Sequence, residues 1–162
     1  MDTELLMLET NGFKIARAVE RDILDLSILS KQFFKEAKKN GYNLTFKQDK
    51  FAQSFLNIVN NPSYYYLLAT KDGEAVGFFL GGIISPLFSD DVLAVEMFWW
   101  VTEEFRGQNV AIPMLKMFEA WAKQSGATQV NVSDLQNVKN LDNLYKRLGY
   151  SRSEVTYRKD MP

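Results

Sequence analysis

The segment from Val92 to Gly126 constrains the fold more than any other part of the sequence. Residues 92–101 (VLAVEMFWWV) are nearly all apolar and rich in β-branched and aromatic side chains, which predicts a strand buried on both faces. Beyond them, apolar residues recur with helical spacing. The helix is expected to end at Gly126, because glycine readily adopts the left-handed backbone conformation that terminates helices. The apolar stripe consists of Ala111, Met114, Leu115, Phe118, Trp121 and Ala122. A strand, a turn and an amphipathic helix therefore follow one another.

The turn between this strand and this helix has the character of an anion site. The first amides of a helix lack intrahelical acceptors and point outward as donors. Gly107 permits close approach of a ligand, and Arg106 adds a cation. Charge-assisted hydrogen bonds contribute roughly 1.5–3 kcal/mol each, more than the roughly 0.3–1 kcal/mol of the helix dipole. The turn predicts phosphate binding by main-chain amides; the alternative is an ordinary connection with a solvated arginine.

The sequence of this turn resembles the acyl-CoA signature of the GNAT superfamily of N-acetyltransferases, Arg/Gln-x-x-Gly-x-Gly/Ala. Its six residues are Arg106, Gly107, Gln108, Asn109, Val110 and Ala111. Asn109 replaces the usual glycine, but asparagine tolerates positive φ and caps helices well. Pro113 fits only in the first helical turn, so the helix begins near Asn109.

A second motif lies at the distance expected for that superfamily. Residues 140–150 (NLDNLYKRLGY) resemble its closing helix and following strand, Leu-Tyr-x-x-x-Gly-Phe/Tyr, with Tyr145 at the tyrosine position. The resemblance covers residues 12–158, and the combination of FWWV (98–101), RG (106–107) and EAWAKQSGA (119–127) resembles small members encoded by bacteriophages.

The resemblance implies an α/β (α+β type) fold: a mixed, mostly antiparallel sheet, splayed at its centre, with helices on both faces. The implied order is β-α-α-β-β-β-α-β-α-β in a single domain, residues 1–162. Apart from the central unit, strands are expected at 13–19, 64–70, 75–84, 128–133 and 153–158, and helices at 22–38, 46–59 and 140–148.

Composition narrows the chemistry. The chain has no cysteine and no histidine, which excludes thiolate or histidine metal sites and cysteine or histidine catalysis, so no metal is expected. Its net charge is −1 without a basic stripe, which argues against nucleic acid. We find neither a signal peptide nor a membrane-length apolar run, so a cytoplasmic protein without membrane contact is expected, and a homodimer is compatible with the sequence.

Two residues are the candidates for acid–base catalysis. Glu96 is the only charge in its apolar strand, where burial raises the pKa of a carboxyl group toward that of a useful base; the alternative is a purely structural glutamate. Asp91, Glu103 and Glu104 lie in or beside turns and are poorer candidates. The superfamily places the tyrosine at position 145 beside the CoA sulfur, where it protonates the thiolate; the alternative is a core aromatic.

Together these features predict an acyl-CoA-dependent N-acyltransferase that moves acetyl from its co-substrate acetyl-CoA to a primary amine by direct attack. A strand amide around Trp100 or Val101 stabilises the oxyanion. The amine acceptor is a small molecule or a protein, and in this superfamily it contacts segments equivalent to residues 33–46 and 85–91. The alternative is a catalytically inactive CoA-binding module that acts through a partner protein.

Overall fold

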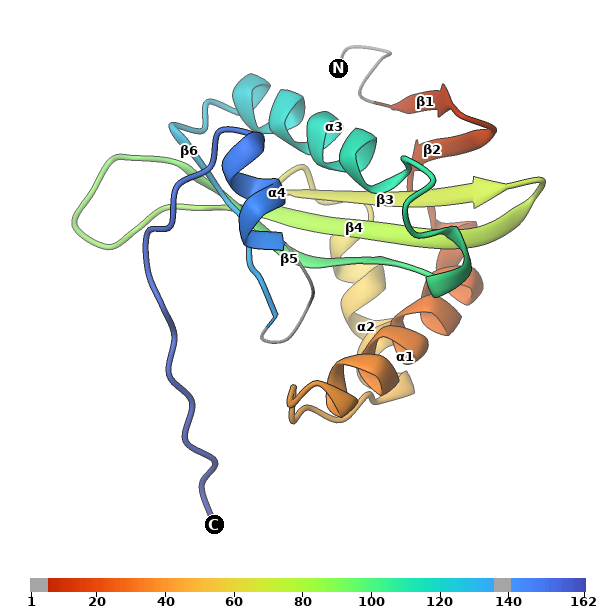
Figure 1. The fold of residues 1–162 in the computed structure, drawn as a ribbon, viewed down its shortest axis with the longest axis horizontal. Helices are drawn as coiled ribbons and strands as arrows, with labels where there is room; N and C mark the ends of the chain where they lie inside the picture. Colours follow the sequence, from red (N-terminus) through yellow and green to blue (C-terminus); the bar gives the residue numbers. More distant parts are fainter. Residues whose placement is uncertain (1–5, 136–140) are drawn as a thin grey trace.

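The computed structural model describes residues 6–135 and 141–162, and its centre is a six-stranded sheet in the order β1-β2-β3-β4-β5-β6 (Figure 1). All neighbouring strands are antiparallel except β5 and β6, which run parallel. The strands are β1 (Met7–Thr10), β2 (Phe13–Arg17), β3 (Tyr64–Lys71), β4 (Glu74–Ile84), β5 (Leu93–Val101) and β6 (Gln129–Asn131). The helices are α1 (Ile23–Lys39), α2 (Gln48–Ile58), α3 (Ala111–Gln124) and α4 (Leu141–Arg147). This is the predicted mixed sheet.

Helices cover both faces of the sheet, as predicted, and each face has its own core (Figure 1). On one face, the predicted apolar stripe of α3 packs on β3, β4 and β5, with Phe118 and Leu115 fully buried. On the other, α1 and α2 pack through Leu26, Phe33 and Phe55. In the described part of the chain, no helix combines the length and apolar character needed to span a membrane.

The N-terminal hairpin is an addition that the sequence analysis did not predict. β1 pairs with β2 through a tight turn in which Asn11 and Gly12 both have positive φ (52° and 80°). This is the conformation of a type I′ turn, for which Asn-Gly is a strong signal. The predicted β3–β4 hairpin uses the same geometry, with Asp72 at 51° and Gly73 at 81°.

Strand β5 changes its neighbours halfway along its length. Its first residues pair with β6, but that pairing ends at Val95 opposite Asn131. Immediately after, the register with β4 shifts: Leu80 faces Phe98 while Gly81 faces Glu96, so Met97 is an extra residue, a β-bulge. Beyond the bulge, β5 has no neighbour on the β6 side among the described residues, which is the predicted splay at the centre of the sheet.

The predicted final strand at residues 153–158 is wrong. Residues 151–162 form no strand, their side chains are exposed, and the tail runs away from the body of the protein (Figure 1). Val155 and Tyr157 have strand-forming side chains, but a strand also needs a backbone partner, and local pattern does not supply one. The helix predicted over 140–148 is observed as Leu141–Arg147, and residue 140 lies outside the described residues.

Candidate active site

The turn before α3 presents a set of unpaired main-chain donors. Gly107 and Asn109 both have positive φ (78° and 61°), so Asn109 adopts the conformation expected of the glycine it replaces. Val110, the residue before α3, returns to right-handed dihedrals, and this alternation makes a concave nest of amides suited to anions. Among the described residues, the amides of Gly107, Asn109, Val110 and Ala111 have no acceptor. The geometry therefore suits a phosphate group, and phosphate binding at this turn stays a prediction.

Three of the six residues of the signature turn have side chains that leave this nest open. Val110 is buried in the core beneath α3, and Ala111 is half-buried. Gln108 turns sideways: its amide nitrogen donates to the carbonyl of Glu104 (3.1 Å), and its amide oxygen accepts from Lys71 (3.3 Å). A Cβ at Gly107 would meet no protein atom within 4 Å, so the approach to the backbone is clear of protein.

Arg106 connects this turn to helix α1. Its two terminal nitrogens donate to the Glu36 carboxylate (2.7 and 2.6 Å), and its Nε donates to the Val101 carbonyl (2.8 Å). The indole of Trp100 donates to the same carboxylate (2.5 Å), and the guanidinium lies 5.8 Å from that ring centroid. The hydrogen bond from Arg106 is the main reason that the pKa of Glu36 lies below its ordinary value. Arg106 thus holds the turn in place, and a direct contact with phosphate stays a prediction.

Glu96 lies in the splay with only 8% of its surface exposed. Burial raises the pKa of its carboxyl group to about 7, although the backbone N–H of Ser133 donates to it (3.0 Å) and opposes the shift. A carboxyl group with this pKa is partly ionised at neutral pH and can both accept and release a proton. The environment therefore has the property that the sequence analysis expected of a general base.

Tyr145 and Glu96 are both hydrogen-bonded to the backbone of Ser133. The Tyr145 hydroxyl donates to the carbonyl of Ser133 (2.8 Å), whose N–H serves Glu96, and its ring packs against Trp99 (centroids 6.4 Å apart). Burial, and secondarily the charge of Glu96, raises the pKa of the Tyr145 phenol. The phenol therefore keeps its proton at neutral pH, as a general acid must.

The backbone of β5 offers one of the two predicted oxyanion donors to the splay. Thr102 N–H donates to the carbonyl of Val76 on β4 (2.9 Å). Hydrogen-bonded and non-bonded pairs alternate along antiparallel strands, so Trp100 also bonds to β4, whereas Trp99 and Val101 turn their backbone groups away from it. The amide of Val101 faces the open side, and that of Trp100 belongs to the sheet.

Sequence reasoning missed three residues of this site. Glu36 anchors Arg106 from a position 70 residues away, and nothing in the α1 sequence singles it out. Ser133 acts through its backbone, which no side-chain pattern reveals. Tyr42 lies near Glu96, whose charge adds to burial in raising the pKa of the Tyr42 phenol.

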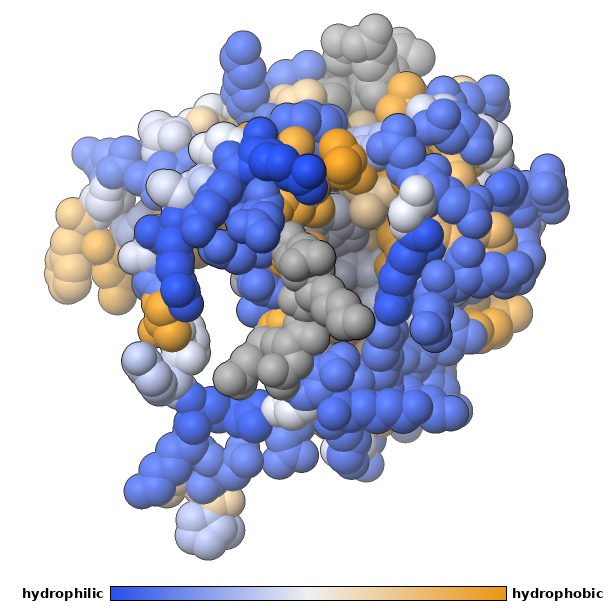
Figure 2. All heavy atoms as spheres, viewed as in Figure 1, coloured by the Kyte–Doolittle hydropathy of each residue, from blue (hydrophilic) through white to orange (hydrophobic). Residues whose placement is uncertain are grey.

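Residues 85–91, one of the two segments expected to contact the acceptor, lie apart from the cluster of Glu96, Ser133 and Tyr145. The β4–β5 loop, residues 85–92, extends beyond one end of the sheet, and Figure 2 shows apolar atoms at its tip. Leu87 and Phe88 there are almost completely exposed. The other segment, residues 33–46, in contrast, lines a cavity beside β5 that is described below.

Comparison with known proteins identifies the family. A model of the acetyltransferase (GNAT) family matches residues 27–150, well over half of the chain, and includes the strand, the turn, Glu96 and Tyr145. The protein therefore belongs to the GNAT family of acetyltransferases. A comparison with curated protein sequences gives no match.

Solved structures share the fold at low sequence identity. The glucosamine-6-phosphate N-acetyltransferase of Arabidopsis thaliana superposes with a TM-score of 0.69 and 17% identity, covering 95% of this chain and 100% of that one. The aminoglycoside 6'-N-acetyltransferase AAC(6')-Ih of Acinetobacter baumannii gives 0.71 and 18%, covering 93% and 100%. The ribosomal-protein-alanine N-acetyltransferase of Brucella melitensis gives 0.72 and 13%, covering 93% and 99%. These likenesses concern the fold, and their acceptors differ widely.

Proposed function

We propose that this protein transfers an acetyl group from acetyl-CoA to a primary amine by direct attack in a ternary complex. The observation that carries the proposal is the meeting of Glu96 and Tyr145 on the two sides of Ser133, at the splay of the sheet. The unpaired amides at residues 107–111 support it, because they suit the phosphates of CoA. A cytoplasmic location and a bacteriophage origin stay predictions.

Each residue then has one task. Glu96, directly or through a water molecule, accepts a proton from the acceptor ammonium, so that the neutral amine attacks the thioester carbonyl. The Val101 N–H donates to the carbonyl oxygen as negative charge develops there. Tyr145 gives its proton to the departing thiolate and takes up the second proton that the attacking nitrogen loses, and Glu96 releases its proton to solvent. No covalent enzyme intermediate is needed, in keeping with the absence of cysteine and histidine.

The test is to mix the purified protein with acetyl-CoA and a panel of primary amines and to follow release of the CoA thiol. We expect amine-dependent release, with the acetylated amine confirmed by mass spectrometry. Titration calorimetry with CoA runs in parallel. Tight CoA binding without turnover of any amine would contradict the proposal and favour the CoA-binding module instead.

A further inference from the structure

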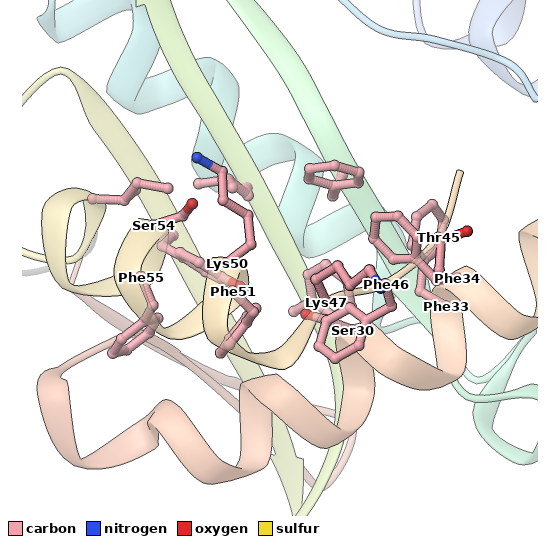
Figure 3. A pocket seen from close by; sticks show the side chains of 15 residues that line it. Ser30, Phe33, Phe34, Thr45, Phe46, Lys47, Lys50, Phe51, Ser54 and Phe55 are labelled. Atoms are coloured by element: carbon pink, nitrogen blue, oxygen red, sulfur yellow. The ribbon is translucent and has the colours of Figure 1, made fainter. Parts of the chain in front are cut away.

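A cavity of about 250 Å³ lies between helices α1 and α2 and the strands β4 and β5 (Figure 3). It is on the sheet face opposite α3. The parts of the lining that matter here are a buried apolar floor, an aromatic wall, and an exposed rim. Phe55, Phe78 and Leu80 contribute to the floor, Phe33, Phe34 and Phe98 to the wall, and Lys47 and Lys50 to the rim.

The lining of the cavity is mainly apolar. Tyr66 and Ser30 carry hydroxyl groups that are hydrogen-bonded to one another, and the half-buried Ser54 and the exposed Thr45 add two more. The charged groups of the lining are the two lysines at the rim, Lys47 and Lys50, and no acidic residue lines the cavity. Among the described residues, neither lysine has an ion-pair partner within 4.0 Å. The cavity therefore suits an apolar body, and its rim suits an anion.

The wall of the cavity leads to the proposed base. The ring of Tyr42 packs on Phe33 and Phe34 (centroids 6.1 and 6.0 Å apart), both of which line the cavity. Tyr42 is also near enough to Glu96 for the charge of that carboxylate to add to burial in raising the pKa of the Tyr42 phenol. Phe98, which lines the cavity, belongs to the same strand as Glu96. Tyr42 therefore connects the aromatic wall of the cavity to the neighbourhood of Glu96.

The size of the cavity indicates how large the apolar body is. An apolar cavity of about 150 Å³ holds benzene. The observed volume of about 250 Å³ accommodates a six-membered ring and a few further carbons. A polyamine or an aminoglycoside carries several cations, which would lose hydration against the aromatic floor and be repelled by the lysines at the rim.

Resting on the proposed function, we infer that the acceptor is a small amphiphilic amine. It has an aromatic or branched aliphatic body that fills the cavity, a primary amine directed to Glu96, and a carboxylate or other anionic group that reaches Lys47 and Lys50. This class differs from the polycationic and sugar acceptors that a shared fold alone would leave open.

The first test compares acceptors by kcat/KM. The set is 4-(2-aminoethyl)benzoate, phenethylamine, spermidine and kanamycin, each with acetyl-CoA. We expect kcat/KM to decrease in the order given, and the carboxylate to add about tenfold over phenethylamine because it gains a hydrogen bond between charged groups at the lysine rim. Faster turnover of spermidine or kanamycin would overturn the inference and leave the proposed function intact.

Variants assign the preference to this cavity. Lys50→Glu reverses a charge at the exposed rim, and we expect it to abolish the roughly tenfold advantage of the carboxylated amine. Lys123→Glu makes the same change of net charge on α3, on the opposite face of the sheet, and leaves that ratio unchanged. Ser54→Trp fills the cavity and lowers kcat/KM for both aromatic amines at least about tenfold. Equal ratios in Lys50→Glu and the parent would overturn the role of the rim.

A binding experiment separates failure of the inference from failure of the proposed function. 4-Propylbenzoate lacks the amine, so its binding, measured by calorimetry, needs no turnover. We expect it to bind to the parent and to lose binding in Ser54→Trp. Binding without turnover of any amine would sustain the site and refute catalysis. If Ser54→Trp instead discriminates only against long acyl-CoA donors, the cavity holds the acyl chain and the inference is wrong.

Discussion

The raised pKa of Glu96 predicts that this residue destabilises the folded protein at neutral pH. Its carboxyl group moves from an ordinary value of 4.5 to about 7 on folding. One pKa unit corresponds to about 1.4 kcal/mol, so the difference amounts to about 3 kcal/mol. Because the pKa is higher in the folded state, the protonated group stabilises the fold fully below pH 4.5, and this contribution is lost as the pH rises through 7.

Glu96→Gln tests this prediction directly. The glutamine oxygen can still accept the Ser133 N–H, but it cannot ionise, so the variant escapes the cost of a buried carboxylate. We expect the stability of the variant relative to the parent to increase by about 3 kcal/mol between pH 4.5 and pH 8. The variant should be less active than the parent although it is more stable. In the parent kcat/KM should decline below pH 7, and this decline should disappear in the variant.

The assay is urea unfolding followed by tryptophan fluorescence at several pH values, for the parent, Glu96→Gln and Glu103→Gln. Glu103 is an exposed glutamate in the turn after β5, so its variant serves as the matched control and should follow the parent at every pH. If the free energies of unfolding of Glu96→Gln and the parent remained parallel from pH 4.5 to pH 8, the carboxyl group would have an ordinary pKa. The argument for Glu96 as the base would then be lost.

Five further variants test the rest of the site. Tyr145→Phe should fold and bind CoA like the parent but turn over about 10- to 1000-fold more slowly; an unchanged rate would remove the general-acid role. Gly107→Val forces a β-branched residue to adopt a φ of 78° beside the amide nest, so it should weaken CoA binding, measured by calorimetry, at least about tenfold. Asn109→Gly should keep the affinity for CoA within about threefold of the parent. The reverse order of the two variants would refute the turn assignment. Arg106→Ala and Glu36→Ala should weaken CoA binding to a similar, modest extent if the pair positions the turn; stronger binding in Glu36→Ala would instead mean that Arg106 contacts phosphate once released.

The strand–turn–helix unit was predictable because its signals are local. Hydrophobic periodicity locates β5 and α3 to within a residue or two, and the tolerance of asparagine for positive φ anticipates Asn109 at 61°. Glu96 could be singled out because a lone carboxylate in an apolar strand is buried at a cost in stability, and such buried ionisable groups are common at functional sites. The Asn11-Gly12 turn carried an equally local signal, and the N-terminal hairpin could have been predicted from it.

The remaining features depend on contacts between distant segments. The bidentate pair between Arg106 and Glu36 joins residues 70 positions apart, and side chains of either type are usually solvated. Ser133 contributes two backbone atoms whose positions follow from the end of β6, not from a serine side chain. The extra residue at Met97 is recognisable only from the register of β5 against β4.

The splay beyond Val95 also means that, within residues 6–135 and 141–162, β5 carries an open sheet edge in the interior of the protein. Edge strands expose unpaired donors and acceptors and are usually kept short or covered, because they recruit other chains. Here the edge of β5 lies beside the proposed reaction centre, so an extended ligand that paired with this edge would complete the sheet as well as present its reactive end. Occupancy and folding are then thermodynamically linked: a ligand at a hundred times its Kd adds about 2.7 kcal/mol to stability.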